Sequence, residues 1–188
     1  NDADLDESND LAVRVIADTH WVDAEYTLRK NISFADQAHD TAQWVVGGSW
    51  NSGMKPKSDD GTIVSNQRQF QVNNRPQRVE LTTGGTEAVA DLLVQDNTAP
   101  ITVGITAGST INVVTGDAVI GSKGAIELNT GALIVNPTQK VSVSGSGMLS
   151  GTGAVTGAVE VGIAGGSHAM LSPGINPTGS SVGVGTLS

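Results

Sequence analysis

The sequence predicts an all-β protein, a parallel β-helix or β-solenoid with an aromatic-containing cap region at its N-terminal end. Three observations predict this fold. The residues after Pro100 are rich in glycine and poor in charge, and short β-branched segments recur there at a constant spacing. All Trp, Tyr and Phe residues lie within the first 70 positions. Together these features indicate a stack of similar short strands that is closed by an atypical first part.

Strand signals are clearest from Ile101 onward. This part contains 18 of the 24 glycines and only five charged side chains. Low complexity can indicate disorder, but the β-branched runs are bounded by Gly, Asn-Thr-Gly or Asn-Pro, which is typical of strands joined by turns. The centres of the expected strands are Val103, Ile111, Val119, Ile126, Leu133, Val141 and Leu149.

The spacing of these centres is seven or eight residues, which is too short for hairpins with ordinary loops. Three such spacings match one coil of a parallel β-helix, which takes about 20 to 25 residues in three strands. Alternation along each strand then predicts which side chains face outward, namely Thr110, Asn112 and Glu127. The predicted inward set is Ile111, Val113, Ile126, Leu128, Leu133 and Val135.

The start of the solenoid is expected near Thr62, because short apolar runs such as "TIV", "VEL" and "VADLLV" follow it every eight to twelve residues. We therefore divide the chain into residues 1–61, a β-rich cap or assembly segment, and residues 62–188, the solenoid. Within residues 11–28, alternation favours strands over a helical turn. Repeat arrays need an atypical end, and the aromatic residues suit that role.

Two stretches resemble bacterial secreted proteins with autotransporter-associated β-strand repeats, many of which carry a PEP-CTERM type sorting tail. The stretch "SWNSGMKPKSDDGTIV" resembles the Trp-x-x-Gly-x-x-Pro element of that family through Trp50, Gly53 and Pro56. The last residues resemble its Leu-Ser-Pro-Gly and Gly-Thr-Leu elements through Leu171, Ser172, Pro173, Gly174, Gly185, Thr186 and Leu187.

The likeness covers about residues 44 to 188 and implies a right-handed β-solenoid that is secreted and lies at the cell surface or in the extracellular matrix. In that family the Gly-Thr-Leu strand continues into further coils. We therefore expect the chain to be a fragment of a longer solenoid, or its open end to be completed by another subunit. No sorting tail is recognisable in the sequence.

The charge and composition exclude some partners. The net charge of −9 disfavours nucleic acid and anionic membrane as partners, and no apolar run reaches the roughly 20 residues of a membrane span. Without cysteine, disulfides and thiolate metal sites are impossible. Ca²⁺ is a weak cofactor candidate at Asp2, Asp4 and Asp6, but the glycine and the closing Glu of an EF-hand loop are missing, which favours a solvated acidic end. Asp59 and Asp60 beside Gly61 could also bind Ca²⁺, but their spacing is more typical of a turn.

Catalysis is not expected. Polysaccharide-degrading β-helices need clustered carboxylates on one face, and Asp117, Glu127 and Glu160 are predicted to lie apart. Trp21, Trp44 and Trp50 leave two interpretations open, a sugar-stacking platform or anchors of the N-terminal core.

Three functions remain. The first is an extracellular structural protein, a stalk, matrix or filament subunit or adhesin that self-associates through strand pairing at the solenoid ends. The alternative is a carbohydrate-binding or polysaccharide-degrading β-helix with a surface polysaccharide as partner. The third is a tail-fibre segment in which three chains trimerise.

Overall fold

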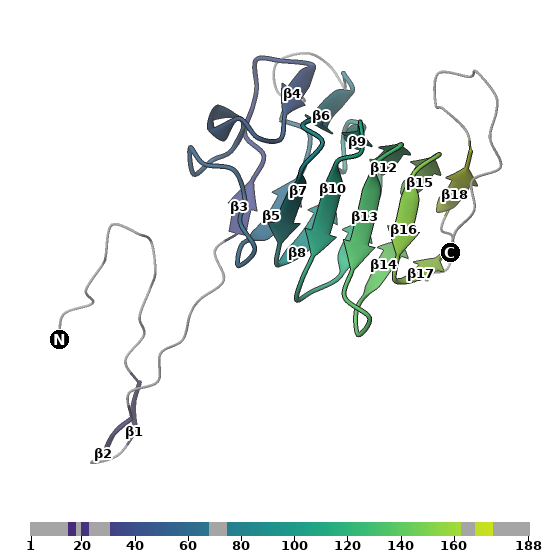
Figure 1. Cartoon of the computed structure of the whole chain (residues 1–188). Helices are drawn as coiled ribbons and strands as arrows, with labels where there is room; N and C mark the ends of the chain where they lie inside the picture. The colour runs from purple at the N-terminus through teal and green to yellow at the C-terminus, as the bar shows by residue number, and fades with distance from the viewer. Residues whose placement is uncertain (1–14, 18–19, 23–30, 68–74, 163–167, 175–188) are drawn as a thin grey trace.

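The computed structural model describes residues 15–17, 20–22, 31–67, 75–162 and 168–174, with side chains from Asn31 onward. Figure 1 shows stacked coils of short strands. They form a β-solenoid of about four turns. The described residues contain no α-helix, only one 3₁₀ turn, η1 (Gly47–Ser49). Near the N-terminus, β1 (Val15–Ala17) and β2 (His20–Val22) pair antiparallel, in agreement with the strands expected there.

All strand pairs of the three larger sheets are parallel, and from β5 to β16 each coil contributes one strand to each sheet. The first sheet consists of β3 (Asn31–Ser33), β5 (Gly61–Val64), β8 (Asp91–Val94), β11 (Ala118–Ile120), β14 (Lys140–Val143) and β17 (Ala158–Val161). The second consists of β4 (Thr41–Gln43), β6 (Gln77–Leu81), β9 (Ile101–Thr106), β12 (Gly124–Asn129), β15 (Met148–Gly151) and β18 (Met170–Pro173). The third consists of β7 (Thr86–Val89), β10 (Thr110–Val113), β13 (Ala132–Val135) and β16 (Ala154–Thr156).

Each of the seven expected strand centres lies in a strand of its own, from β9 to β15, and the strands visit the three sheets in turn. Thr110 pairs with Ala132, so this coil advances the chain by 22 residues, within the predicted range. The coils nearer the N-terminus are longer, since Gly61 pairs with Asn31 and with Asp91, 30 residues away on each side. The predicted fold class is confirmed.

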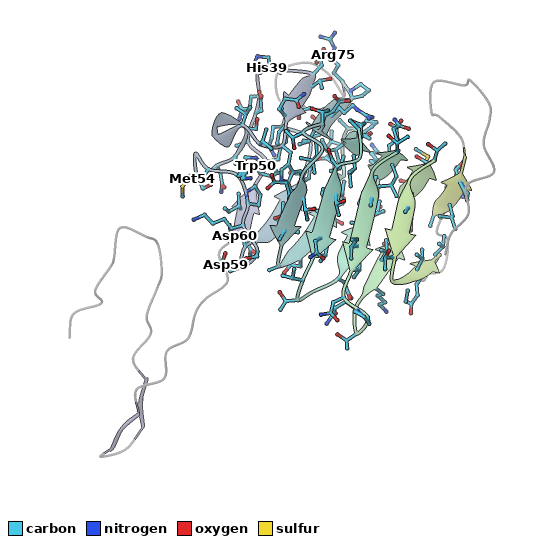
Figure 2. The ribbon with its side chains drawn as sticks, viewed as in Figure 1. His39, Trp50, Met54, Asp59, Asp60 and Arg75 are labelled. Carbon is cyan, nitrogen blue, oxygen red and sulfur yellow. The ribbon has the colours of Figure 1, made fainter. Side chains whose placement is uncertain are left out.

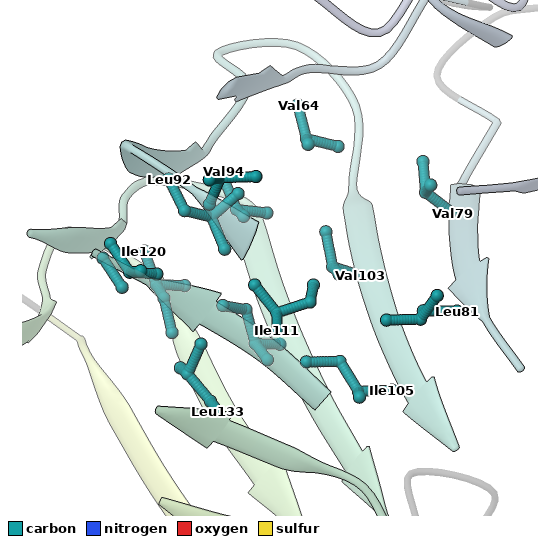
Figure 3. Close-up of a cluster of buried hydrophobic side chains, with 14 of the residues drawn as sticks. Val64, Val79, Leu81, Leu92, Val94, Val103, Ile105, Ile111, Ile120 and Leu133 are labelled. Carbon is teal, nitrogen blue, oxygen red and sulfur yellow. The ribbon is translucent and has the colours of Figure 1, made fainter. Parts of the chain in front are cut away.

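Aliphatic side chains fill the interior, as the alternation predicted, and Figure 3 shows part of this cluster. Small and β-branched residues suit this narrow interior because each stacks on its equivalent one coil away, for example Ile111 on Leu133. The whole predicted inward set is buried, namely Ile111, Val113, Ile126, Leu128, Leu133 and Val135.

One predicted outward residue is not solvated. Glu127 was expected to face water, but it is only 3% exposed, so that expectation is wrong. Its direction is outward, as alternation requires, yet its neighbour in the preceding coil is Gly104, which has no side chain. Arg78, two coils away, extends over this glycine and covers the Glu127 carboxylate. Alternation gives the direction of a side chain but not what a neighbouring coil places over it.

Parallel pairing begins at Asn31, upstream of the expected start near Thr62. The early strands β3 and β4 have three residues each, which is too few for alternation to be visible in the sequence. The third sheet has no strand before β7, and residues 44–60 occupy the chain between β4 and β5 instead. We call residues 44–60 the cap segment, and we call β16, β17 and β18 the C-terminal coil.

Candidate functional site at the ends of the solenoid

Aromatic packing closes the N-terminal end. The Trp50 indole lies edge-on to Phe34 and to Trp44, with ring centroids 5.9 and 4.9 Å apart. All three rings are buried, and the Trp50 Nε1 donates a hydrogen bond of 2.8 Å to the Trp44 carbonyl. Figure 2 shows Trp50 among the side chains of this end, while Met54 of the same cap segment projects outward. The aromatic cluster thus forms a lid on the aliphatic core.

The cap segment also bonds the outward backbone groups at the end of β3. The Ala35 amide donates to the Ser49 carbonyl, and the Asn51 amide donates to the Ser33 carbonyl, both at 2.9 Å. The Ser33 amide donates to the Asn51 Oδ1 at 3.0 Å. Backbone groups that an edge strand would otherwise offer to another chain are therefore bonded within this chain.

A charged pair lies at the start of the third sheet. In β7, Glu87 is paired in register with the buried Ile111, so its side chain points inward, toward the end that the cap segment covers. Lys55 of the cap segment reaches it, with Nζ 2.7 Å from each carboxylate oxygen. An inward-pointing charge at a terminal strand disfavours the addition of another strand, because a further coil would bury it.

The opposite end has no comparable cover among the described residues. In the first sheet, Val159 and Val161 continue the inward column of Val141 and Val143. The two earlier valines are 0% exposed, whereas Val159 is only partly buried and Val161 is 41% exposed. The core therefore reaches the surface at the C-terminal coil with an apolar side chain.

Backbone groups face outward at the same place. The Gly162 amide donates back to the Val143 carbonyl at 2.9 Å. Because successive residues of a strand direct their backbone groups to opposite sides, the amides and carbonyls of Val159 and Val161 point away from the preceding coil. β16, β17 and β18 are the outermost strands of the three sheets in the described part of the chain.

Two further features belong to the C-terminal coil. Met170 in β18 is 52% exposed. A mostly apolar hollow of about 590 Å³ extends to this coil, and its lining includes Asn112, Ile134, Pro137, Thr156 and Gly157. The hollow lies beside the corners that follow β13 and β16, where four residues separate β13 from β14 and Gly157 alone separates β16 from β17.

An ion-pair network crosses the outer face of the second sheet. Arg78 donates from Nε to Glu80 at 2.6 Å and from Nη1 to Glu127 at 2.5 Å, and Asn129 donates to the other Glu127 oxygen at 2.5 Å. Burial acts to lower the pKa of Arg78, but the hydrogen bonds to Glu127 and Glu80 outweigh it and raise that pKa. The network joins β6 to β12 across Gly104, where a Cβ atom would collide with the Arg78 guanidinium.

Of the three predicted carboxylates, Glu127 lies apart in the second sheet, as expected, but the expectation that Asp117 and Glu160 lie apart is wrong. Asp117 directly precedes β11 and Glu160 lies in β17, both in the first sheet. Lys140 bonds to both, since its amide donates to Asp117 Oδ1 at 3.0 Å and its Nζ donates to Glu160 at 2.8 Å. Sequence reasoning missed Glu80 as the neighbour of Glu127, because it searched only the residues after Ile101. The missed inward charge at Glu87 was visible as an acidic residue in an inward position of "TEAV".

The two tryptophans of the expected sugar platform that the structure describes, Trp44 and Trp50, pack on each other in the core and offer no ring face to a sugar. Trp21 lies in β2, and its side chain is outside the described residues. Gly53 has a positive φ in the cap segment, and Pro56 is buried there.

Of the second motif, Leu171, Ser172 and Pro173 lie in β18, and Gly174 follows with a positive φ of 78°. Gly185, Thr186 and Leu187 lie outside the described residues.

The calcium candidates Asp2, Asp4 and Asp6 also fall outside the described residues. Within the described ranges, no three His, Asp or Glu side chains are grouped so that they could hold a metal ion. The Asp36 carboxylate accepts hydrogen bonds from the His39 ring and from the amides of Ala38 and His39. Burial raises the pKa of Asp36, but these hydrogen bonds outweigh it and hold the pKa below its ordinary value.

The chain matches no protein-family model, no curated protein and no solved structure. Among the described residues, no helix has the length and apolar character needed to cross a membrane.

Proposed function

We propose that this protein is an extracellular structural β-solenoid, a stalk, matrix or filament component, and that its C-terminal coil is the site of assembly. The observation that carries the proposal is the contrast within one inward column. Val141 and Val143 are fully buried, whereas Val161, one coil later, is 41% exposed. A further strand on β17 would bury this side chain and satisfy the outward backbone groups at the same time.

The location outside the cell rests on the resemblance to secreted proteins with autotransporter-associated β-strand repeats. Two sequence elements of that resemblance lie in different parts of the structure. Trp50, Gly53 and Pro56 belong to the cap segment, and the Leu-Ser-Pro-Gly element forms β18 and the turn after it. The motifs therefore coincide with the two ends of the described part of the solenoid, where an assembling protein is expected to differ from its repeats.

The carbohydrate-degrading alternative receives less support. Arg78, Glu80 and Glu127 do form a charged cluster on one outward face, as such enzymes require. However, the Glu127 side chain is only 4% exposed, and both of its oxygens accept hydrogen bonds from protein donors. A carboxylate in that state holds coils together and is not positioned to transfer a proton to a substrate.

The test is a comparison of two lysine variants by light scattering across a range of protein concentrations. Val161→Lys places a charge on the C-terminal coil, and Val46→Lys places one on the 50% exposed Val46 of the cap segment. We expect the unaltered protein and Val46→Lys to associate, and Val161→Lys to stay monomeric. A monomer at every concentration for the unaltered protein, or association that Val161→Lys leaves unchanged, would contradict the proposal. Circular dichroism checks that both variants remain folded.

A further inference from the structure

We infer that the partner of the C-terminal coil is a second copy of the same chain, bound end to end through a twofold axis, so that assembly stops at a dimer; among the proposed roles this favours a stalk or matrix component over a filament built from this chain alone. This inference rests on the proposed function and specifies its partner. It depends on the difference between the two ends of the solenoid, because a fibre requires that one end bind the other.

The N-terminal end opposes such a fibre. A head-to-tail contact would bring β17 of one copy against β3 of the next, but the outward backbone groups of Ser33 in β3 are already bonded to Asn51, and the Ala35 amide just after β3 is bonded to Ser49. The same contact would bury Glu87 and Lys55 against an apolar coil. Removing this ion pair from water costs free energy that its hydrogen bonds only partly return. Strand addition at this end therefore requires the cap segment to be displaced.

Two C-terminal coils can meet without displacing anything that the structure describes. The outward groups of Val159 and Val161 comprise both donors and acceptors, and a twofold rotation reverses the strand direction. β17 then pairs antiparallel with β17 of the second copy. The exposed Val161 side chains of the two copies meet and complete the core of each.

The distribution of charge favours the same arrangement. Among the described residues, those from 31 to 100 carry eight carboxylates against four lysines and arginines, whereas those from 101 to 174 carry three carboxylates against two lysines. In the last two coils of the first sheet, Glu160 is neutralised by Lys140 at 2.8 Å. A contact between C-terminal coils thus keeps the more acidic described coils of the two copies, those within residues 31–100, at opposite ends of the dimer, which limits their repulsion.

The test uses light scattering together with a unique thiol. The chain contains no cysteine, so Ala158→Cys on the exposed start of β17 introduces one reactive group at the C-terminal coil. Val46→Cys is the matched control on the cap segment. With a short bifunctional maleimide, we expect Ala158→Cys to give cross-linked dimers and Val46→Cys to stay uncross-linked. The mass of the unmodified protein should reach a plateau at two chains.

Each other outcome is informative. A mass that grows beyond two chains with concentration, or cross-linking of Val46→Cys in place of Ala158→Cys, overturns the twofold dimer. If that growth is abolished by Val161→Lys, the C-terminal coil remains the assembly site and only the geometry of the partner is wrong. A protein that stays monomeric at all concentrations overturns the inference together with the proposed function.

Discussion

The two ends of the described solenoid differ in how their terminal strands and core are covered. Every parallel stack ends in strands with unpaired backbone groups and with a core that has no next layer. At the N-terminal end, the cap segment supplies Trp50 for the core and Ser49 and Asn51 for the β3 edge. At the C-terminal coil, Val161 and the β17 edge are left open in the described structure.

This difference indicates that covering the end of a solenoid and stacking its coils require different residue types. Interior coils are held by small aliphatic side chains that stack on their equivalents, and such residues cannot close a stack because their pattern invites another coil. The closed end departs from the pattern with large rings and an inward-pointing ion pair, Lys55 and Glu87. An end that keeps the pattern, as β17 does, is suited to association.

The largest expected effect is the loss of the aromatic lid. Trp50→Ala should lower the free energy of unfolding by about 3 to 5 kcal/mol, because a fully buried indole is replaced by a cavity. Urea unfolding followed by circular dichroism measures it. Leu171→Ala, at the partly exposed C-terminal coil, is the matched control and should cost less than half as much. Equal costs for the two variants would show that the ends do not differ in burial.

The next largest loss of unfolding free energy is expected for the network of Arg78, Glu80 and Glu127 that passes over Gly104, between the two ends. Arg78→Ala leaves the buried Glu127 without its cation and should cost about 3 kcal/mol in the same unfolding measurement. The double variant Arg78→Ala/Glu127→Ala should be more stable than Arg78→Ala alone, since no buried charge is then left unpaired. A double variant that is less stable than Arg78→Ala alone would contradict this interpretation.

A modest effect is expected at the inward-pointing pair of the closed end. Lys55→Met should cost about 1 to 2 kcal/mol, because Glu87 keeps its charge in a largely covered position without the Nζ donor. Glu87→Gln in the Lys55→Met background should return part of this stability. If Lys55→Met is neutral, the Lys55 contact contributes nothing and the cap segment is held by its aromatic residues alone.

The smallest effect concerns pH. The pKa of Asp36 is lowered in the folded protein, so its contribution to stability is present above the pKa of the unfolded chain, near 4, and is lost as the pH falls through the folded pKa. Asp36→Asn should therefore be less stable than the unaltered protein at pH 6, and this difference should shrink below about pH 4. Unfolding curves at several pH values measure it. A difference that is independent of pH would exclude an ionised Asp36 as its cause.

Most of the repeating part could be predicted from the sequence, because its strands are specified by residues that are close together in the chain. The spacing of β-branched runs gave all seven strands from Val103 to Leu149, and alternation gave their inward side chains. The site was less accessible to sequence reasoning. Arg78 covers Glu127 from 49 positions away, and Lys55 pairs with Glu87 from 32 positions away. Whether such residues meet depends on how many residues each coil contains.

The early coils show why that number could not be read from the sequence. Gly61 pairs 30 residues away on each side, which is longer than the predicted coil, because the cap segment and other insertions lie between the strands. Insertions at corners leave no periodic signal. The sequence therefore located the aromatic region correctly without revealing that its backbone seals the edge of β3.

The contrast between the ends is tested most directly by amide hydrogen exchange, followed by NMR on dilute protein. The amides of Ser33 and Ala35 donate to Asn51 and Ser49, so they should exchange slowly. The amides of Val159 and Val161 should exchange rapidly in dilute solution and slow down as the concentration rises and copies associate. Equally strong protection of all four amides at the lowest concentration would contradict an open C-terminal coil.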